Sequence, residues 1–291
     1  MTSSIVMITK AETSATDSAV AGAARLRPVP DGSALLTTSS TPSPAPAPPP
    51  APAPDLAGAV AGADAIAGGD IDLGVAVLDF NTGQVTSGHQ GSKPFYTASL
   101  SKLLLTVDML TRRATGDLQI SDSDLELVDR ALTASDDDVM DSLWTTYDGT
   151  SAIERVASAA GMTETTPPRD PSQWGEVVVS AADMTRLFYL ITHKMAAGDR
   201  DVVIGDLSAT QRRATDGFDQ FFGLLDDSRG VYAKQGWMYY LPSDLYLHSC
   251  GVVNNRFAVA VLSIQTGVAT QTARNRLGEV SSSLLRVLLS A

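Results

Sequence analysis

Apolar and polar positions alternate in two separate parts of the chain, and this period of two predicts strands. The first part starts at Leu73, with a strand over 74–79, a turn over 81–83 and a second strand over 84–88. The second part runs over 232–264 and contains a hairpin with strands 245–253 and 257–264. Asn254 and Asn255 mark the turn of this hairpin, because asparagine tolerates the backbone angles that tight turns require.

Between the two strand regions, the apolar residues recur with helical spacing. We expect helices over 122–133, 138–147, 150–160 and 181–194, and a closing helix over 273–289. Ser180 is a plausible N-cap for the helix at 181, with Asp183 at the third helical position. The predicted fold class is therefore α/β (α+β): one antiparallel sheet made from N- and C-terminal strands, with a helical lobe inserted between them.

The N-terminal part of the chain has a different composition. Residues 42–54 alternate proline with alanine and hold eight of the fifteen prolines, a pattern typical of an extended, semi-rigid linker. The residues before this linker are rich in Ser, Thr and Ala and show no sustained period. We therefore expect a disordered segment over 1–54 and a single globular domain over 55–291.

Charge and hydropathy limit the possible partners. A formal net charge of −12 argues against nucleic acid and anionic membrane surfaces. No window approaches the roughly 18 apolar residues of a membrane span, so we expect no integral membrane segment. Residues 1–10 lack the features of a signal peptide, whereas a proline-rich stalk is typical of exported proteins. We expect export or association with the cell envelope, and a cytoplasmic location stays open. Cys250 is the only cysteine and falls in a predicted buried strand, so an intramolecular disulfide is excluded.

Ser99 and Lys102 are the first pair with candidate chemistry. A serine and a lysine three residues apart at the start of a helix lie on the same face, one turn apart. Lys102 could take the proton of the Ser99 hydroxyl if burial keeps the amine deprotonated, and the apolar run over 103–110 would supply that burial. Of the five lysines, only Lys102 has a serine three residues before it. Helix capping by Ser99 is the alternative.

Two further motifs follow in a fixed order. Ser135 precedes Asp136 and Asp137, and Lys234 precedes Gln235 and Gly236 on a predicted strand. The order S-x-x-K, S-D-[N-like], K-x-G is the signature of penicillin-recognising serine enzymes.

On these motifs, and on the strand and helix pattern from about Leu73 onward, the chain resembles the class A β-lactamase-like serine hydrolases, relatives of the penicillin-binding proteins. The resemblance implies that Ser99 is the nucleophile, Lys102 its base and Ser135 a proton relay. It further implies that the Lys234 charge attracts a substrate carboxylate, Gly236 lets the strand approach the ligand, and the N–H of Trp237 is the second oxyanion donor.

The chain departs from the family pattern at three positions. Asp137 stands where the family usually has asparagine, and a carboxylate accepts hydrogen bonds but cannot donate them. Gln235 replaces the usual Thr or Ser, which helps to bind the substrate carboxylate. By its place in the motif Gln235 is still assigned to substrate binding, as is Asp137. Glu176 is a weak candidate for the base of deacylation, because it follows Trp174 by two residues rather than one.

These observations leave several functions open. The first is acylation of Ser99 by a β-lactam or a cell-wall D-alanyl amide, with slow β-lactam turnover. The second is a degenerate module that binds a cell-wall ligand or a protein partner without catalysis, and the third is hydrolysis of small esters. We expect a monomer that takes a small-molecule or peptidoglycan-derived substrate, with no cofactor. His89, His193 and His248 are far apart in the sequence, so neither a metal site nor a Ser-His-Asp triad is assigned.

Overall fold

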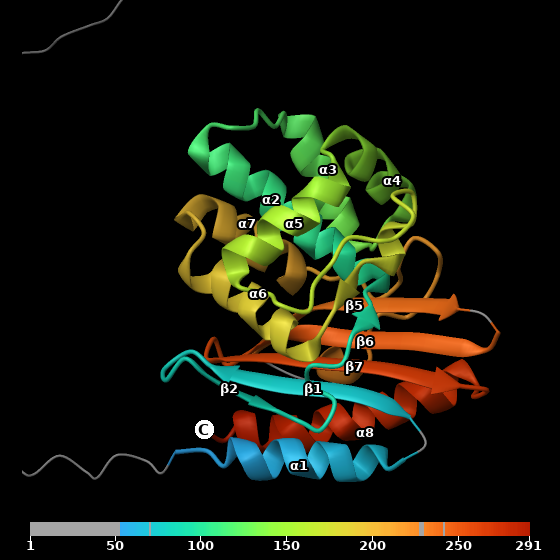
Figure 1. Cartoon of the computed structure of the whole chain (residues 1–291). Coiled ribbons are helices and arrows are strands. Elements are labelled where there is room, and N and C mark those ends of the chain that lie inside the picture. The colour runs from blue at the N-terminus through green and yellow to red at the C-terminus, as the bar shows by residue number, and fades with distance from the viewer. Residues whose placement is uncertain (1–52, 70, 227–229, 241) are drawn as a thin grey trace, which may run out of the picture. The chain divides into compact units, whose positions relative to one another are not determined.

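A five-stranded antiparallel sheet is built from both ends of the folded domain (Figure 1). The computed structural model describes residues 53–69, 71–226, 230–240 and 242–291. The strand order is β2-β1-β7-β6-β5, and Asp72 of β1 pairs with Ile264 of β7. The prediction of one sheet from N- and C-terminal strands is therefore confirmed. The strands are β1 (Asp72–Asp79), β2 (Gln84–Ser87), β5 (Val231–Tyr240), β6 (Asp244–Val253) and β7 (Phe257–Thr266).

The hairpin between β6 and β7 turns at the predicted residues. Asn254 and Asn255 both have φ of 52°, in the left-handed region that asparagine enters more readily than most residues. Val253 pairs with Phe257 directly across the turn, so the register of the two long strands is fixed there.

Two helices, α1 (Leu56–Ala67) and α8 (Thr270–Leu288), cover one face of the sheet (Figure 1). Asp55 caps α1, since its carboxylate accepts a hydrogen bond from the N–H of Gly58 at 2.8 Å. The sequence did not predict α1, because its alanine- and glycine-rich sequence shows little separation of apolar and polar faces. The predicted disordered segment 1–54, with its linker 42–54, lies outside the described residues except for Ala53 and Pro54.

The helical lobe lies on the other face of the sheet (Figure 1). Four of its helices were predicted with ends that agree within about one residue, namely α3 to α6. The lobe consists of α2 (Ser101–Thr115), α3 (Asp122–Thr133), α4 (Asp137–Thr146), α5 (Gly149–Ala160), α6 (Ala181–His193) and α7 (Ala197–Ser208). None of the helices in the described part of the chain is both long and apolar enough to cross a bilayer.

The start of α6 confirms the predicted cap and adds a second function for Asp183. The Ser180 hydroxyl accepts a hydrogen bond from the N–H of Asp183 at 3.1 Å. The carboxylate of Asp183 is fully buried and accepts hydrogen bonds from the N–H groups of Thr163 and Glu164. It thereby anchors the start of the long segment between α5 and α6, which later contributes Trp174 to the candidate site.

Short elements hold the chain in place just before Ser99. Strands β3 (Phe95–Tyr96) and β4 (Val178–Val179) form a small separate sheet. The N–H of Thr97 donates to the carbonyl of Val177 at 2.8 Å, and the 3₁₀ turn η1 (Ala98–Leu100) follows directly. Two more 3₁₀ turns, η2 (Trp174–Glu176) and η3 (Gly223–Leu225), complete the described elements.

Candidate active site

Ser99 lies in a strained turn at the head of α2. The residue before it, Ala98, has φ of 46°, a value that is uncommon for a residue other than glycine and is often found at functional sites. The hydroxyl of Ser101 donates to the carbonyl of Ala98 at 2.9 Å and helps to hold this turn. Ser99 itself is 4% exposed, and it lines the cleft described below.

Lys102 lies one helical turn after Ser99, as the sequence spacing predicts. Its Nζ donates a hydrogen bond to the Oγ of Ser99 at 2.7 Å, and the lysine is almost fully buried. Burial lowers the pKa of Lys102, because the charged ammonium loses solvation. The free amine is therefore available at lower pH than in an ordinary lysine, as proton transfer from the serine requires.

Two neighbours act on the Lys102 amine in addition to Ser99. A carboxylate oxygen of Asp137 lies 2.6 Å from Nζ, and its charge opposes the effect of burial on the Lys102 pKa. The indole ring of Trp174 covers the same amine at 4.4 Å, a cation–π arrangement. Because both contacts favour the ammonium form, they work against the role of Lys102 as a base.

Ser135 lies in a tight loop between α3 and α4 and has φ of 52°. The next residue, Asp136, caps α4 by accepting from the N–H of Val139, and it forms an ion pair with Arg130 at 2.6 Å. Burial raises the pKa of Asp136, but these hydrogen bonds outweigh it and hold the pKa below the usual value. The N-cap of α4 is therefore Asp136 rather than Ser135, which leaves the Ser135 hydroxyl available for Lys234.

Lys234 extends from β5 toward the Ser135 loop. Its Nζ donates to the Oγ of Ser135 at 2.9 Å and to the carbonyl of Gln235 at 3.1 Å. The side chain is buried, and burial, reinforced by the charge of Lys102, lowers the Lys234 pKa well below its usual value. The structure thus places Lys102 against Ser99, three residues away in the sequence, and Lys234 against Ser135, 99 residues away.

Gln235 does not occupy the position that the sequence predicted. Its side chain is fully buried, and its amide donates to the carbonyls of Gln220 at 3.2 Å and Phe222 at 2.6 Å. Side chains alternate between the two faces of a strand, so Gln235 points away from the face that carries Lys234. The assignment of Gln235 to substrate binding is therefore corrected, because its amide holds the segment before η3 against the sheet.

Gly236 makes a close approach to the chain's own serine turn. A Cβ at this position would lie 2.8 Å from the carbonyl oxygen of Thr97, too close for a side chain. Glycine is thus required for β5 to pack against η1, whether or not it also approaches a ligand. Since β5 is an edge strand, the N–H of Trp237 stays a candidate oxyanion donor.

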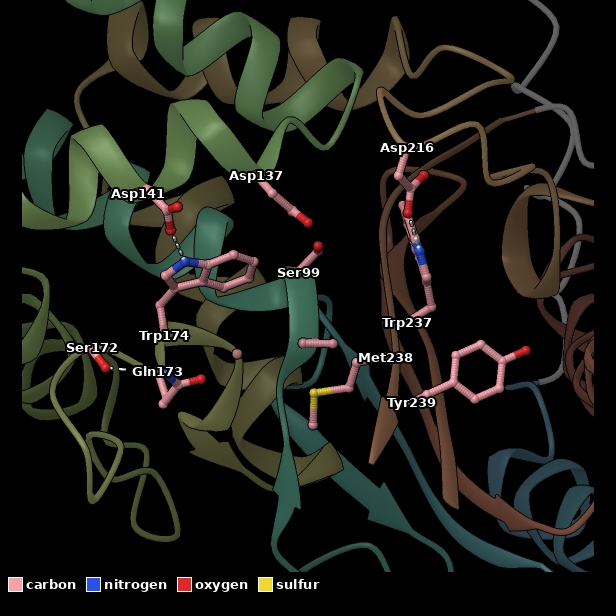
Figure 2. A pocket seen from close by; sticks show the side chains of 12 residues that line it. Ser99, Asp137, Asp141, Ser172, Gln173, Trp174, Asp216, Trp237, Met238 and Tyr239 are labelled. Atoms are coloured by element: carbon pink, nitrogen blue, oxygen red, sulfur yellow. Dashed lines mark hydrogen bonds between the residues drawn. The ribbon is translucent and has the colours of Figure 1, made fainter. Parts of the chain in front are cut away.

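Of the predicted site residues, Ser99, Asp137 and Trp237 line a cleft with a volume of about 610 Å³ (Figure 2). Ser99 lies at its centre, with Trp174 on one side and Trp237 on the other. The lining comes from η1, α4, the loop around Trp174, the loop before β5, and β5 itself. It comprises Ala98, Ser99, Asp137, Asp141, Ser172, Gln173, Trp174, Gly175, Asp216, Trp237, Met238 and Tyr239.

Asp141 and Asp216 line the cleft and were not found from the sequence. Asp141 accepts from the indole N–H of Trp174 at 2.7 Å, and Asp216 accepts from that of Trp237 at 3.0 Å (Figure 2). Asp216 is brought to the site by its neighbour, because the N–H of Thr215 donates to the carbonyl of Ala134 at 2.9 Å. No local sequence signal marks Asp216, since its place depends on this contact across the fold.

Glu176 is not among the described residues that line the cleft. Its charge instead acts on Tyr240, whose pKa is raised first by a hydrogen bond to Tyr96 and by the charge of Glu176 among other causes. The structure therefore gives no support to Glu176 as the base of deacylation.

The three histidines stay apart, as expected. His248 is fully buried, with Nε2 lying 2.8 Å from the carbonyl of Tyr96, and Nδ1 accepting from the N–H of Ser263. Burial lowers its pKa to about 4, so it is neutral and holds β3 against the sheet. Within the described ranges, no group of three or more His, Cys, Asp or Glu is arranged to hold a metal ion. Cys250 is a buried free thiol on β6, in agreement with the prediction of a buried strand.

No family model matches the sequence. Among curated proteins, the chain is similar to one named "Putative lipoprotein LppW" from Mycobacterium bovis and from Mycobacterium tuberculosis. The identity is 32% over 203 residues, which cover 66% of this chain. The match spans 63% of the length of these relatives.

Solved structures of class A β-lactamases match most of the chain. A β-lactamase from Chitinophaga pinensis superposes with a TM-score of 0.67 at 14% identity, over 79% of this chain and 98% of that one. The TLA-3 extended-spectrum β-lactamase gives a TM-score of 0.66 at 14% identity, over 80% of this chain and 98% of the other. A class A representative from Bacteroides cellulosilyticus gives 0.63 at 14% identity, over 76% and 93%. The chain has the class A β-lactamase-like fold.

Proposed function

We propose that this protein is a serine hydrolase that forms an acyl-enzyme on Ser99. The observation that carries the proposal is the 2.7 Å hydrogen bond between Lys102 Nζ and Ser99 Oγ, in a site where both residues are buried yet the serine opens onto a cleft. A helix-capping serine would not require a buried lysine beside it, because burying an ammonium group away from water is unfavourable.

In the proposed acylation, the free amine of Lys102 takes the Ser99 proton while Oγ bonds to the substrate carbonyl carbon. The N–H groups of Ser99 and Trp237 stabilise the oxyanion. The bond from that carbon to the leaving amine or alkoxide then breaks. The proton that Lys102 took from Ser99 passes to the Ser135 hydroxyl, which gives its own proton to the leaving group, so Lys102 returns to the free amine. Lys234 holds the Ser135 hydroxyl in place through a hydrogen bond at 2.9 Å.

Deacylation is the slow step of the proposed cycle. It requires a base that activates water, and Glu176 is not part of the cleft lining in the described structure. Asp137 could accept a proton, but its carboxylate is already paired with Lys102 at 2.6 Å. The expected behaviour with a β-lactam is thus slow acylation and poor turnover.

Asp137 and the Ser99–Lys102 pair favour different functions. The Asp137 carboxylate stands where an amide donor would help to hold the acyl group of a β-lactam or a D-alanyl amide, and this favours small esters or a non-catalytic binding module. The intact Ser99–Lys102 pair favours catalysis over the binding module. We therefore place ester and amide acyl transfer first, with binding alone as the second candidate.

A location at the cell envelope is part of the proposal. It is supported by the name of the mycobacterial relatives, which describes a lipoprotein, and by the proline-rich sequence before the domain. A cell-wall peptide or a small molecule that reaches the envelope is then the class of substrate to test.

The test is intact-protein mass spectrometry after exposure to benzylpenicillin and, separately, to a fluorophosphonate. We expect one fluorophosphonate adduct on the wild type and slow, incomplete penicilloylation, with both absent in Ser99→Ala. Ser172→Ala is the matched control, because Ser172 also lines the cleft while its hydroxyl donates to Asp170. Absence of both adducts on a folded wild type would reject catalysis and favour the binding module.

A further inference from the structure

The charged groups around the cleft are distributed in a way that bears on the substrate. Three carboxylates, those of Asp137, Asp141 and Asp216, line it. Among the described residues, the lining includes no Lys, Arg or His side chain. Lys102 lies behind the lining and pairs with Asp137 at 2.6 Å, and Lys234 is 1% exposed and bonded to Ser135. Among the described contacts, Asp141 and Asp216 are therefore the two carboxylates of the lining that form no ion pair.

Lys234 is poorly placed to bind a substrate carboxylate. Its Nζ is already engaged by Ser135 Oγ at 2.9 Å and the Gln235 carbonyl at 3.1 Å, and the residue is 1% exposed. Gln235, the other residue expected to help, faces the opposite side of the sheet and holds the carbonyls of Gln220 and Phe222. Lys234, which the sequence assigned to carboxylate binding, and Gln235, which stands in place of the usual Thr or Ser, are thus both occupied by contacts within the protein.

Asp216 lines the cleft next to Trp237, and its charge reaches Lys234. It is exposed, its charge acts on both Lys234 and Lys102, and its carboxylate is oriented by the indole of Trp237 at 3.0 Å and by the N–H of Phe218 at 2.8 Å. The loop is fixed to the Ser135 segment through Thr215 N–H and the Ala134 carbonyl. An anion bound beside Lys234 would therefore meet a fixed negative charge.

The same acidic character continues beyond the cleft. A second groove, of about 630 Å³, lies on the other side of Trp174 and shares Asp141, Ser172 and Trp174 with the first. It adds Asp148, and within the described part of the chain its lining too includes no Lys, Arg or His.

From these contacts we infer that the cleft accepts a substrate or ligand that carries an ammonium or guanidinium group, with Asp216 as the residue that selects for it. The inference rests on the proposed function only where ester hydrolysis is measured. Preference for a cationic ligand can also be measured by binding, without cleavage. Carboxylate-bearing substrates, β-lactams among them, are disfavoured by the same charge.

The first experiment compares three p-nitrophenyl esters of equal chain length: 6-aminohexanoate, hexanoate and the adipate monoester. We expect kcat/KM at pH 7 to fall in that order, with the cationic ester exceeding the anionic one by roughly tenfold to a hundredfold at low salt, the range for a charge near a partly solvated carboxylate. Sodium chloride at about 0.5 M should reduce the ratio through screening. Equal rates, or preference for the adipate ester, would overturn the inference.

Variants identify the residue responsible. Asp216→Asn and Asp216→Ser should each reduce the cation-to-anion ratio several-fold, mainly through KM. Asp201→Asn is the matched control, since Asp201 is also an exposed acid but lies on α7 away from the cleft lining. An unchanged ratio in both folded Asp216 variants would contradict the assignment to Asp216.

A binding measurement separates this inference from the proposed function. In Ser99→Ala, the indole N–H resonance of Trp237 is followed by NMR during titration with hexylamine and, separately, with hexanoate. We expect saturable shifts with hexylamine and weaker shifts with hexanoate, even if the wild type forms no acyl-enzyme. Shifts with hexanoate alone, or with neither probe, would reject the cationic ligand. If the wild type forms no fluorophosphonate adduct on Ser99 but the Ser99→Ala variant still binds hexylamine, only the proposed function is rejected.

Discussion

The two walls of the cleft differ in how closely they follow the class A pattern. The helical wall, formed by η1, α2 and the Ser135 loop, keeps a buried serine–lysine pair at 2.7 Å and a second buried serine that bonds to Lys234. The strand wall, formed by β5 and the loop before it, keeps Lys234 and Gly236 but turns Gln235 inward and adds Asp216. In the proposed enzyme, the reacting groups and the groups that recognise the substrate therefore lie on different walls, so the second set can change while the first is retained.

The largest expected effect comes from removing the base of the helical wall. Lys102→Met should reduce the rate of fluorophosphonate acylation by about 10²- to 10⁴-fold, the range for loss of a general base. The measurement is the rate of adduct formation by intact-protein mass spectrometry at pH 8. A loss of less than threefold, with the fold intact by circular dichroism, would show that another group takes the Ser99 proton.

The next prediction concerns the stability of the strand wall. Lys234→Met should raise the free energy of unfolding at pH 7 by roughly 1–3 kcal/mol, because an apolar side chain of similar length avoids burying an amine. The native pKa of Lys234 lies below its unfolded value, so the unfolded chain binds more protons between those two values, and stability of the wild type rises with pH in that window. Lys234→Met should remove this contribution to the slope.

Urea unfolding at pH 6, 7 and 8 measures both parts of that prediction. Lys194→Met is the control, because Lys194 lies at the end of α6 and not in the cleft lining. If Lys234→Met and the wild type have equal free energies of unfolding at every pH, burial of the Lys234 amine does not destabilise the protein, and the prediction for the strand wall is wrong.

Asp137→Asn sharpens the comparison within the helical wall itself. Burial already lowers the Lys102 pKa, and the Asp137 charge opposes this effect, so its removal should lower the pKa further. Acylation requires the free amine, so the rise of rate with pH should move to lower pH. The rate at pH 7 should increase by a few-fold, about two- to tenfold. The readout is the pH profile of fluorophosphonate labelling from pH 5 to 9, and a shift toward higher pH would contradict the assigned ion pair.

The smallest effect is expected at Glu176. Glu176→Gln should leave both acylation and turnover of p-nitrophenyl hexanoate within about twofold of wild type, as is usual for a side chain outside the reacting groups. A loss of turnover with acylation retained would instead identify Glu176 as the base that activates water.

The fold and the helical wall could be predicted because their signals are local. The spacing of Ser99 and Lys102 places them on one helix face, and the helix periods predicted α3 to α6 nearly to the residue. The orientation of Gln235 could also have been predicted, since side chains alternate along β5 and Gln235 must lie on the other face of the sheet from Lys234.

Other features depend on contacts that the sequence does not display. Asp216 is brought to the cleft by a backbone hydrogen bond between Thr215 and Ala134, residues far apart in the chain. The positive φ of Ala98 could not be predicted, because alanine, unlike glycine or asparagine, is not typical of that backbone region. Helix α7 was missed for another reason, since its apolar and polar residues do not separate clearly onto two faces.

The pairing of β1 with β7 has a consequence for how the protein is made. Asp72 and Ile264 lie opposite one another, so the sheet that carries Lys234 cannot close until nearly the whole chain has left the ribosome. During synthesis β1 and β2 emerge first and can pair with each other, the helical lobe follows, and β1 gains its second neighbour, β7, only near the end. A truncation that removes only β7 and α8 would leave every motif residue in place but take out the strand that joins β1 to β6, so the two parts of the sheet would lose their connection.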